Sequence, residues 1–286
     1  MNSTERFPRK WPALGIVLLS ILLPFFFASL FITSEDDLLS GKLRTLIIIG
    51  ELFVIIPSLI YIHRKEFPLR SVYRIRNIDR SVGLWGLIIG VGISIIGDEL
   101  DRLISIFFTP PEWLTQSLEF FRISNGLDFL ILIGGVAVIA PLTEELLFRG
   151  FLQTTLEYRE QNVTRAILLT ALAFALLHSN IWWIVQIYLF GLVLSYFSWR
   201  TQSILPGFFI HMGINATSVL LGNLDLQGKL DWYTLGNHVS PIILALACLG
   251  AFYGVQHITD KYPLNSRVSD TILPADIQES DTDGQN

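Results

Sequence analysis

The sequence has 286 residues, of which 51% are hydrophobic and only 16% are charged, and its formal net charge is −5. A soluble domain carries about 25% charged residues, so the composition excludes an ordinary soluble protein and indicates a membrane protein. The mildly acidic balance also excludes the basic footprint of a nucleic-acid-binding protein. The only cysteine, Cys248, leaves no intrachain disulfide and no metal centre built from cysteines.

Apolar segments recur along the whole chain, and each approaches the length of about 20 residues that a helix needs to cross a bilayer. We predict eight spans, at residues 11–33, 45–62, 82–97, 127–156, 164–179, 181–199, 203–222 and 240–257. The first is too long for a signal-peptide core and has no evident cleavage site, so we expect it to be retained. The predicted fold is an all-α, polytopic transmembrane bundle, in a multi-pass protein of the plasma membrane or an internal membrane.

The third span and the residues after it have unusual compositions. The span is rich in glycine, and small residues in lipid more often mark close helix contacts than flexibility. The apolar part of residues 98–121 is too short to cross a membrane and ends at two prolines. We therefore expect an interfacial helix or a loop there, with Asp98, Glu99 and Asp101 in the outer loop.

The chain divides into N-terminal helices and loops at 1–124, a core at 125–257, and an acidic tail at 258–286 whose composition predicts disorder. Orientation follows from Lys and Arg, which favour the cytoplasmic side. With eight spans and the N-terminus inside, 15 of the 20 Lys and Arg residues belong to inner segments, six of them to residues 63–81. We expect both termini to face the cytoplasm or its equivalent.

The fourth span contains Glu144, Glu145 and Arg149. Charged side chains in a membrane helix are costly and usually face the bundle interior or a water-filled cavity, so they are functional candidates. Glu145 and Arg149 are four residues apart and share a helix face, while Glu144 points about 100° away. We expect Arg149 to hold Glu145 and leave Glu144 free to act as a base. The alternative is an acidic patch at a helix end that meets lipid headgroups.

The next span ends near His178, and a short turn at residues 157–163 would make the two spans a hairpin. Glu144 and His178 are nearly equidistant from that turn, so antiparallel helices with equal rise would bring them to the same depth. Taken alone, His178 would more often be a satisfied interfacial residue. Phe174, one turn earlier, is expected to pack rather than react.

The seventh span adds His211 and Asn215, which are four residues apart and project from one helix face. Two donors aimed at a common point are what an oxyanion needs. The alternative is a polar clamp between helices, which membrane bundles also use. Trp182 and Trp183 start the sixth span where an aromatic belt would place them. Glu51 stands alone in the second span, where a neutral carboxyl is expected.

Three motifs in this order resemble the CPBP family, the intramembrane proteases related to type II CAAX prenyl proteases and to bacterial abortive-infection or bacteriocin-immunity proteins. The family pattern Glu-Glu-x-x-x-Arg matches Glu144, Glu145 and Arg149; Phe-x-x-x-His matches Phe174 and His178; His-x-x-x-Asn/Asp matches His211 and Asn215. The resemblance covers about residues 125–225, and the first three spans carry no recognisable signature.

The resemblance implies hydrolysis of peptide bonds in membrane-associated or prenylated substrates, with Glu144 and His178 activating water and His211 and Asn215 stabilising the oxyanion. The partners are then the lipid bilayer and a peptide or lipidated protein. The soluble zinc-protease motif His-Glu-x-x-His is absent; Glu144, His178 and His211 are the ligands expected if the enzyme uses Zn²⁺, and a glutamate-activated water is the interpretation we favour.

Two other classes of protein fit the same polar residues. A transporter or channel would use them to line a proton or ion path, although the sequence has no visible internal repeat. A non-catalytic membrane partner or immunity protein would keep them as scaffold. The sequence identifies neither the substrate nor the oligomeric state.

Overall fold

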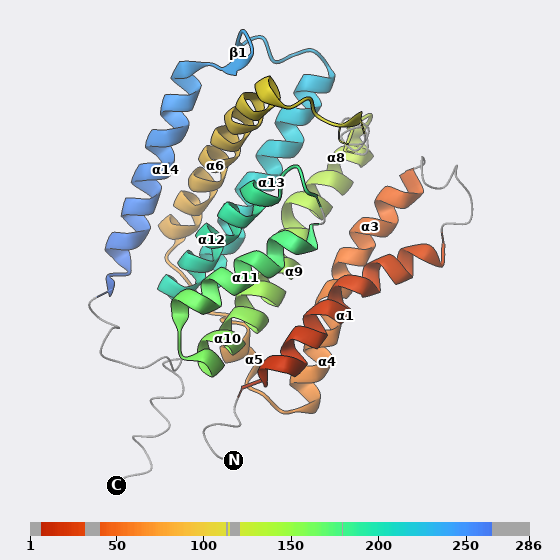
Figure 1. The fold of residues 1–286 in the computed structure, drawn as a ribbon, viewed down its shortest axis with the longest axis vertical. Coiled ribbons are helices and arrows are strands. Elements are labelled where there is room, and N and C mark those ends of the chain that lie inside the picture. Colours follow the sequence, from red (N-terminus) through yellow and green to blue (C-terminus); the bar gives the residue numbers. More distant parts are fainter. Residues whose placement is uncertain (1–6, 32–40, 113, 115–120, 179, 265–286) are drawn as a thin grey trace.

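The computed structural model describes residues 7–31, 41–112, 114, 121–178 and 180–264, which form a bundle of helices (Figure 1). The first helices are α1 (Lys10–Ser29), α3 (Gly41–Val54), α4 (Ile56–Arg64), α5 (Leu69–Val72) and α6 (Arg80–Phe107). A continuous helical segment follows, made of α8 (Gly126–Leu132), η2 (Ile133–Ile139), α9 (Ala140–Glu145), η3 (Leu146–Leu152) and α10 (Gln153–Glu160). The remaining elements are α11 (Val163–Leu177), α12 (Ile184–Thr201), α13 (Leu205–Leu226), β1 (Thr234–Leu235), β2 (His238–Val239) and α14 (Pro241–Lys261).

Short polar signals set several helix ends. The side chains of Asp79, Asn125 and Asn162 accept hydrogen bonds from backbone N–H groups in the first turns of α6, α8 and α11. Both α10 and α12 end at a glutamine in the left-handed conformation, Gln161 and Gln202. Gln161 and Asn162 thus form the tight turn before α11, and Gln202 begins the tight turn after α12.

All eight predicted apolar segments contain helices in the structure, but several bounds were wrong. The second span is divided into α3 and α4, with Pro57 in the first turn of α4. The turn predicted at 157–163 is shorter, because α10 continues to Glu160. The helix predicted to end at residue 257 continues to Lys261, so the tail begins later than predicted. Most of that tail, residues 265–286, lies outside the described part of the chain.

The largest correction concerns the region after residue 97. The prediction of a separate interfacial helix or outer loop was wrong for residues 98–107, because α6 continues through Phe107 as a single helix of 28 residues. Asp98, Glu99 and Asp101 therefore lie on the last turns of α6. Most of residues 113–120 are outside the described part of the chain.

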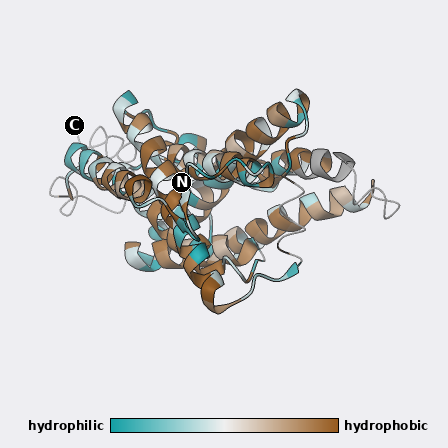
Figure 2. Cartoon of the chain, turned by 90° about the horizontal axis from the view of Figure 1, so that it is seen from above, coloured by the Kyte–Doolittle hydropathy of each residue, from teal (hydrophilic) through white to brown (hydrophobic). Residues whose placement is uncertain are grey.

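Five helices in the described part of the chain are long and apolar enough to cross a membrane: α1, α6, the segment Gly126–Glu160, α13 and α14. α11 is apolar but has only 15 residues. Large apolar side chains are exposed on the outer helices, such as Phe25 on α1 and Phe252 on α14. Figure 2 shows this apolar character along the helices. Such an apolar surface is expected for helices that contact lipid. The number of eight spans remains a prediction.

The order of packing brings α13 and the central segment together. α6 packs against both α13 and α14, α11 packs against α12, and α1 packs against α3. α13 also contacts α12, η2 and α9, while α3 contacts η2 and α9 (Figure 1). α9 therefore lies inside the bundle between α3 and α13.

The glycines of α6 permit a close helix crossing, as the glycine content of this span predicted. A Cβ atom at Gly90 would lie 2.1 Å from the carbonyl oxygen of Ile210, and one at Gly213 would lie 2.7 Å from the carbonyl oxygen of Leu87. Neither position has room for a side chain. This contact between α6 and α13 sets the position of His211, one residue after Ile210.

One end of the bundle gathers the connections that were predicted to be cytoplasmic. Lys10, at the start of α1, pairs with Glu160 at the end of α10. Lys261, at the end of α14, lies 2.9 Å from the carboxylate of Asp79 before α6. The grouping agrees with the alternating path of the chain, and the membrane side that this end faces is still the prediction made from Lys and Arg.

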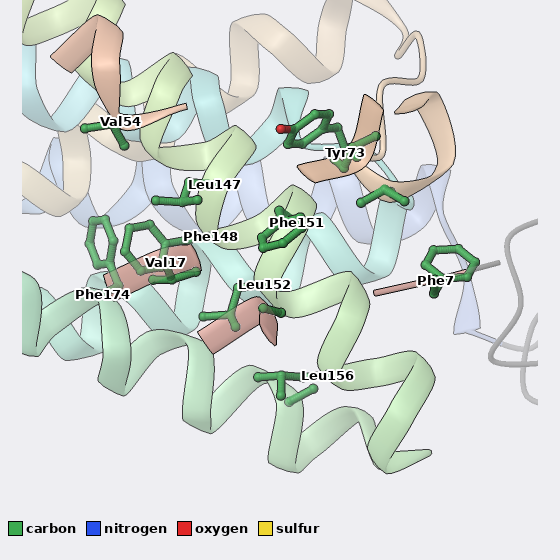
Figure 3. Close-up of a cluster of buried hydrophobic side chains, with 14 residues drawn as sticks. Phe7, Val17, Val54, Tyr73, Leu147, Phe148, Phe151, Leu152, Leu156 and Phe174 are labelled. Atoms are coloured by element: carbon green, nitrogen blue, oxygen red, sulfur yellow. The ribbon is translucent and has the colours of Figure 1, made fainter. Parts of the chain in front are cut away.

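An apolar core joins the N-terminal helices to the central segment. Figure 3 shows Phe148, Phe151 and Leu152 of η3 packed with Val17 of α1 and Phe174 of α11. All five side chains are nearly or fully buried. This core fixes the central segment next to α11, so it also sets the surroundings of the polar residues one turn away.

Candidate active site

The two glutamates lie at the end of α9, between two π-helical stretches. η2 precedes α9 and η3 follows it, so the six-residue α-helix that carries Glu144 and Glu145 is flanked by wider turns on both sides. Pro141 lies in the first turn of α9. π-Helical turns are rare and occur often at functional sites, where they redirect side chains.

Glu145 and Arg149 form the ion pair that their spacing predicted. Arg149 Nη1 donates to Glu145 Oε1 at 2.7 Å, and both side chains are fully buried. Arg149 Nη2 donates to the carbonyl oxygen of Gly191 in α12 at 3.3 Å. The guanidinium also lies over the Phe174 ring, with its carbon 4.2 Å from the ring centroid. Arg149 thus joins three helical segments around one buried carboxylate.

His211 reaches both glutamates from α13. Its Nδ1 lies 3.2 Å from Glu145 Oε1, and its Nε2 lies 3.8 Å from Glu144 Oε2. With Nδ1 protonated and donating to Glu145, Nε2 is the ring atom directed at Glu144. The imidazole is therefore placed between two carboxylates, one paired with Arg149 and one not.

Glu144 and Glu145 have different environments although they are neighbours. Glu145 is completely buried, whereas the Glu144 side chain is 14% exposed. The Oε2 atoms of both glutamates are buried, and among the described residues neither accepts a hydrogen bond. Glu51 of α3 is near enough to interact electrostatically with Glu144. Glu144 is thus the more exposed of the two carboxylates, and the one that is not paired with Arg149.

Gly207 supplies the space for the Glu145 carboxylate. A Cβ atom at Gly207 would lie 2.6 Å from Glu145 Oε2. We predict that Gly207→Ala displaces Glu145 and weakens its contacts with His211 and Arg149, which costs about 1–3 kcal/mol of unfolding free energy and lowers activity. Gly222→Ala in the same helix, where a Cβ meets nothing within 4 Å, is the matched control. Denaturation in detergent measures the unfolding free energies of the two variants. Equal values for Gly207→Ala and Gly222→Ala would contradict the prediction.

Phe174 lies among the two histidines and Arg149. Its ring centroid is 4.6 Å from that of His178 and 5.6 Å from that of His211. His178 is the C-cap residue of α11 and is exposed. Its Nδ1 lies 2.9 Å from the Phe174 carbonyl oxygen. Since that oxygen only accepts, Nδ1 carries the hydrogen, and Nε2 of the neutral ring has a free lone pair. Phe174 therefore packs, as expected, and also separates the two imidazoles.

Asn215 faces a different partner from His211. Its Nδ2 donates to the carbonyl oxygen of Val136 in η2 at 2.9 Å, while His211 contacts the glutamates. The two side chains project from the same helix but do not hydrogen-bond to a common atom. One amide N–H of Asn215 is used by Val136, and the amide has a second.

The structure brings four of the six predicted site residues into one connected group: Glu144, Glu145, Arg149 and His211. His178 adjoins this group through Phe174, and Asn215 lies one turn along α13. For the zinc hypothesis, no three His, Cys, Asp or Glu side chains among the described residues form a group that could hold a metal ion. Glu144, His178 and His211, the ligands expected for Zn²⁺, are not arranged as such a group in the described structure.

A polar stripe continues from this group and was missed in the sequence. Gln153 and Glu157 follow Glu145 and Arg149 at intervals of four, and all four are buried. Gln153 Nε2 donates to Glu157 Oε1 at 2.8 Å, and Glu157 pairs with Arg74 after α5. The four-residue spacing was the available signal. The stripe ties the site to the end of the bundle that holds Lys10 and Asp79.

Comparison with known families supports the assignment of this core. Residues 126–217 match the family described as type II CAAX prenyl endopeptidase Rce1-like. This segment of the chain is Rce1-like. The match confirms the resemblance predicted from the three motifs, and the Rce1-like segment contains all six predicted site residues. No curated protein and no solved structure gives a match.

The Rce1-like family implies a protease, and together with the five candidate spans it identifies a multi-pass integral membrane protein. The helices before residue 126 lie outside the matched segment, yet α1 and α3 pack against it.

Proposed function

We propose that the protein is an intramembrane endopeptidase in which Glu144 activates water. The unequal environments of the two glutamates carry this proposal. Arg149 pairs with Glu145 at 2.7 Å, while Glu144 Oε2 lies 3.8 Å from His211 Nε2 and makes no hydrogen bond within the described part of the chain. A partly exposed carboxylate beside an imidazole is suited to general-base catalysis.

In the proposed reaction, Glu144 takes a proton from water as the water oxygen attacks the peptide carbonyl carbon. Collapse of the tetrahedral intermediate breaks the C–N bond, and the same proton passes from Glu144 to the leaving nitrogen. Atoms and charge balance, since one water and one peptide bond give a carboxylic acid and an amine. His178 Nε2, with its free lone pair, would accept a hydrogen bond from the attacking water.

His211 and Asn215 are the proposed oxyanion donors. His211 is oriented by Glu145, and when protonated it presents Nε2–H toward the side of Glu144. Asn215 is oriented by Val136 and has its second N–H for the substrate. Donors already held by the protein lose little freedom when the oxyanion forms, which is why such donors contribute strongly to rate.

For the substrate, we propose a protein whose carboxyl-terminal Cys-a-a-X sequence is prenylated. The family description supports this choice. A prenyl chain partitions into the bilayer because each buried methylene contributes about 0.8 kcal/mol. The chain would thus bring the scissile bond to the depth of a site that lies within apolar helices.

Purified protein in lipid vesicles tests the proposal with a farnesylated Cys-a-a-X peptide and its unprenylated counterpart. We expect release of the terminal a-a-X tripeptide, faster by about tenfold or more for the farnesylated peptide because of its membrane partitioning. A chelator arm measures any metal requirement. Ion flux into the vesicles without hydrolysis of any membrane peptide would contradict the protease proposal and favour a transporter.

A further inference from the structure

The connection between α11 and α12 follows His178 directly and is anchored at its far end. Trp182 Nε1 donates to Asp101 Oδ1 at 2.8 Å, and Trp183 Nε1 donates to the same oxygen at 3.2 Å. Asp101 belongs to α6, which is distant in sequence from both tryptophans. One carboxylate oxygen therefore accepts two indole N–H groups from adjacent residues.

The backbone of the same connection is held by Asn180. Its Oδ1 accepts hydrogen bonds from the backbone N–H groups of Trp182 at 3.1 Å and Trp183 at 3.3 Å. This Asx turn fixes how the two indoles leave the backbone. Trp183 is the N-cap of α12, so the Asp101 contact holds the connection where it meets that helix.

The neighbouring carboxylates of α6 have other partners. Asp98 pairs with Arg102 at 3.0 Å within the same helix. Glu99 holds the β-hairpin, with Oε1 2.8 Å from His238 Nδ1 and Oε2 accepting from the backbone N–H of Val239. Within the described residues, Asp101 is the one of these three carboxylates that hydrogen-bonds to the connection after His178.

We propose that Asp101 is a positioning residue, which holds His178 at the active site through the indoles of Trp182 and Trp183. This inference rests on the proposed function of His178. Carboxylate acceptors give shorter and stronger hydrogen bonds than neutral ones, so two bonds to one oxygen can fix the half-buried indoles of this connection. His178 itself is exposed, and within the described part of the chain its ring contacts Phe174 on its own helix.

Asp101→Leu removes both indole bonds, and we expect kcat to fall by about 10–100-fold while KM changes little, as a displacement of about 1 Å can cost 10²-fold. Asp101→Asn keeps an acceptor oxygen in place and should retain most of the activity. Asp98→Leu is the matched control on the same helix. Loss of activity equal in Asp98→Leu, or no rescue by Asp101→Asn, would overturn the proposal.

A double-mutant cycle tests whether the indoles transmit the effect. Trp182→Phe with Trp183→Phe should reproduce the loss seen in Asp101→Leu, and adding Asp101→Leu to that pair should cause no further loss. Independent, multiplying losses would contradict the anchor. Each variant is compared at equal amounts of folded protein in the membrane.

A spectroscopic measurement separates this proposal from the protease proposal. A nitroxide label is attached through His178→Cys in a chain that also carries Cys248→Ser, which removes the only other cysteine. We expect Asp101→Leu to make the label more mobile and Asp98→Leu to leave it unchanged. Increased mobility without hydrolysis by any form of the protein would support the anchor and refute the protease; unchanged mobility would refute the anchor.

Discussion

Glu144→Gln should lower kcat for peptide hydrolysis by about 10²–10⁴-fold, the contribution typical of a general base. The amide has the size of the carboxyl group but takes no proton from water. Because Glu144 is partly exposed and makes no ion pair with Arg149, the unfolding free energy should change little. Single-turnover hydrolysis in lipid vesicles and denaturation in detergent measure the two quantities separately.

Two variants make this result specific. Glu66→Gln changes an exposed glutamate on the connection between α4 and α5, and should hydrolyse peptide at the wild-type rate. Glu145→Gln removes the partner of a buried arginine, so it should lose stability as well as activity. Wild-type hydrolysis by Glu144→Gln would refute the base assignment, and full biological activity in that variant would favour a non-catalytic partner protein.

Local spacing was sufficient to predict the pair at the centre of the site. Glu145 and Arg149 are four residues apart. They form the expected pair although the helix changes from α to π directly after Glu145. The apolar segments likewise identified the helices, because lipid requires long apolar runs whatever the tertiary packing. The glycines of α6 indicated a close helix contact, but that α13 is the partner came only from the structure.

Residue spacing along one helix could not predict contacts between distant segments. His211 and Asn215 share a face, which suggested a common target, yet one contacts Glu145 and the other the Val136 carbonyl oxygen. Val136 belongs to π-helical η2, where the usual pattern of backbone hydrogen bonds is interrupted. No periodicity in the sequence distinguishes that turn from an ordinary α-helix.

The acidic end of α6 shows how partners decide the secondary structure. The three carboxylates Asp98, Glu99 and Asp101 predicted an outer loop, because unpaired charges are unfavourable in a membrane helix. Each has a partner in the fold: Asp98 with Arg102, Glu99 with the β-hairpin, and Asp101 with the two indoles. The partners of Glu99 and Asp101 come from segments far along the chain, so these two contacts could not be expected from local composition.

Arg149→Met should lower the unfolding free energy by about 3–5 kcal/mol, because it leaves the buried Glu145 carboxylate without its arginine and with only the His211 contact among the described residues. It also removes the donor to Gly191 and the cation stacked on Phe174. Denaturation in mixed detergent micelles, followed by circular dichroism, measures the loss. Arg149→Lys keeps the charge but cannot bond Glu145 and Gly191 together while stacking flat on the ring, so it should recover only part of the stability.

The double variant Glu145→Gln with Arg149→Met separates the cost of a broken pair from the role of the pair in catalysis. With neither charge present, no unpaired ion remains in the core, so most of the lost stability should return. Hydrolysis should stay low, because His211 Nδ1 then lacks the carboxylate that orients its ring. Recovery of both stability and hydrolysis would show that Glu145 and Arg149 only hold the helices together. Recovery of stability alone would place the pair in the chain of contacts through which Glu145 orients His211 toward Glu144.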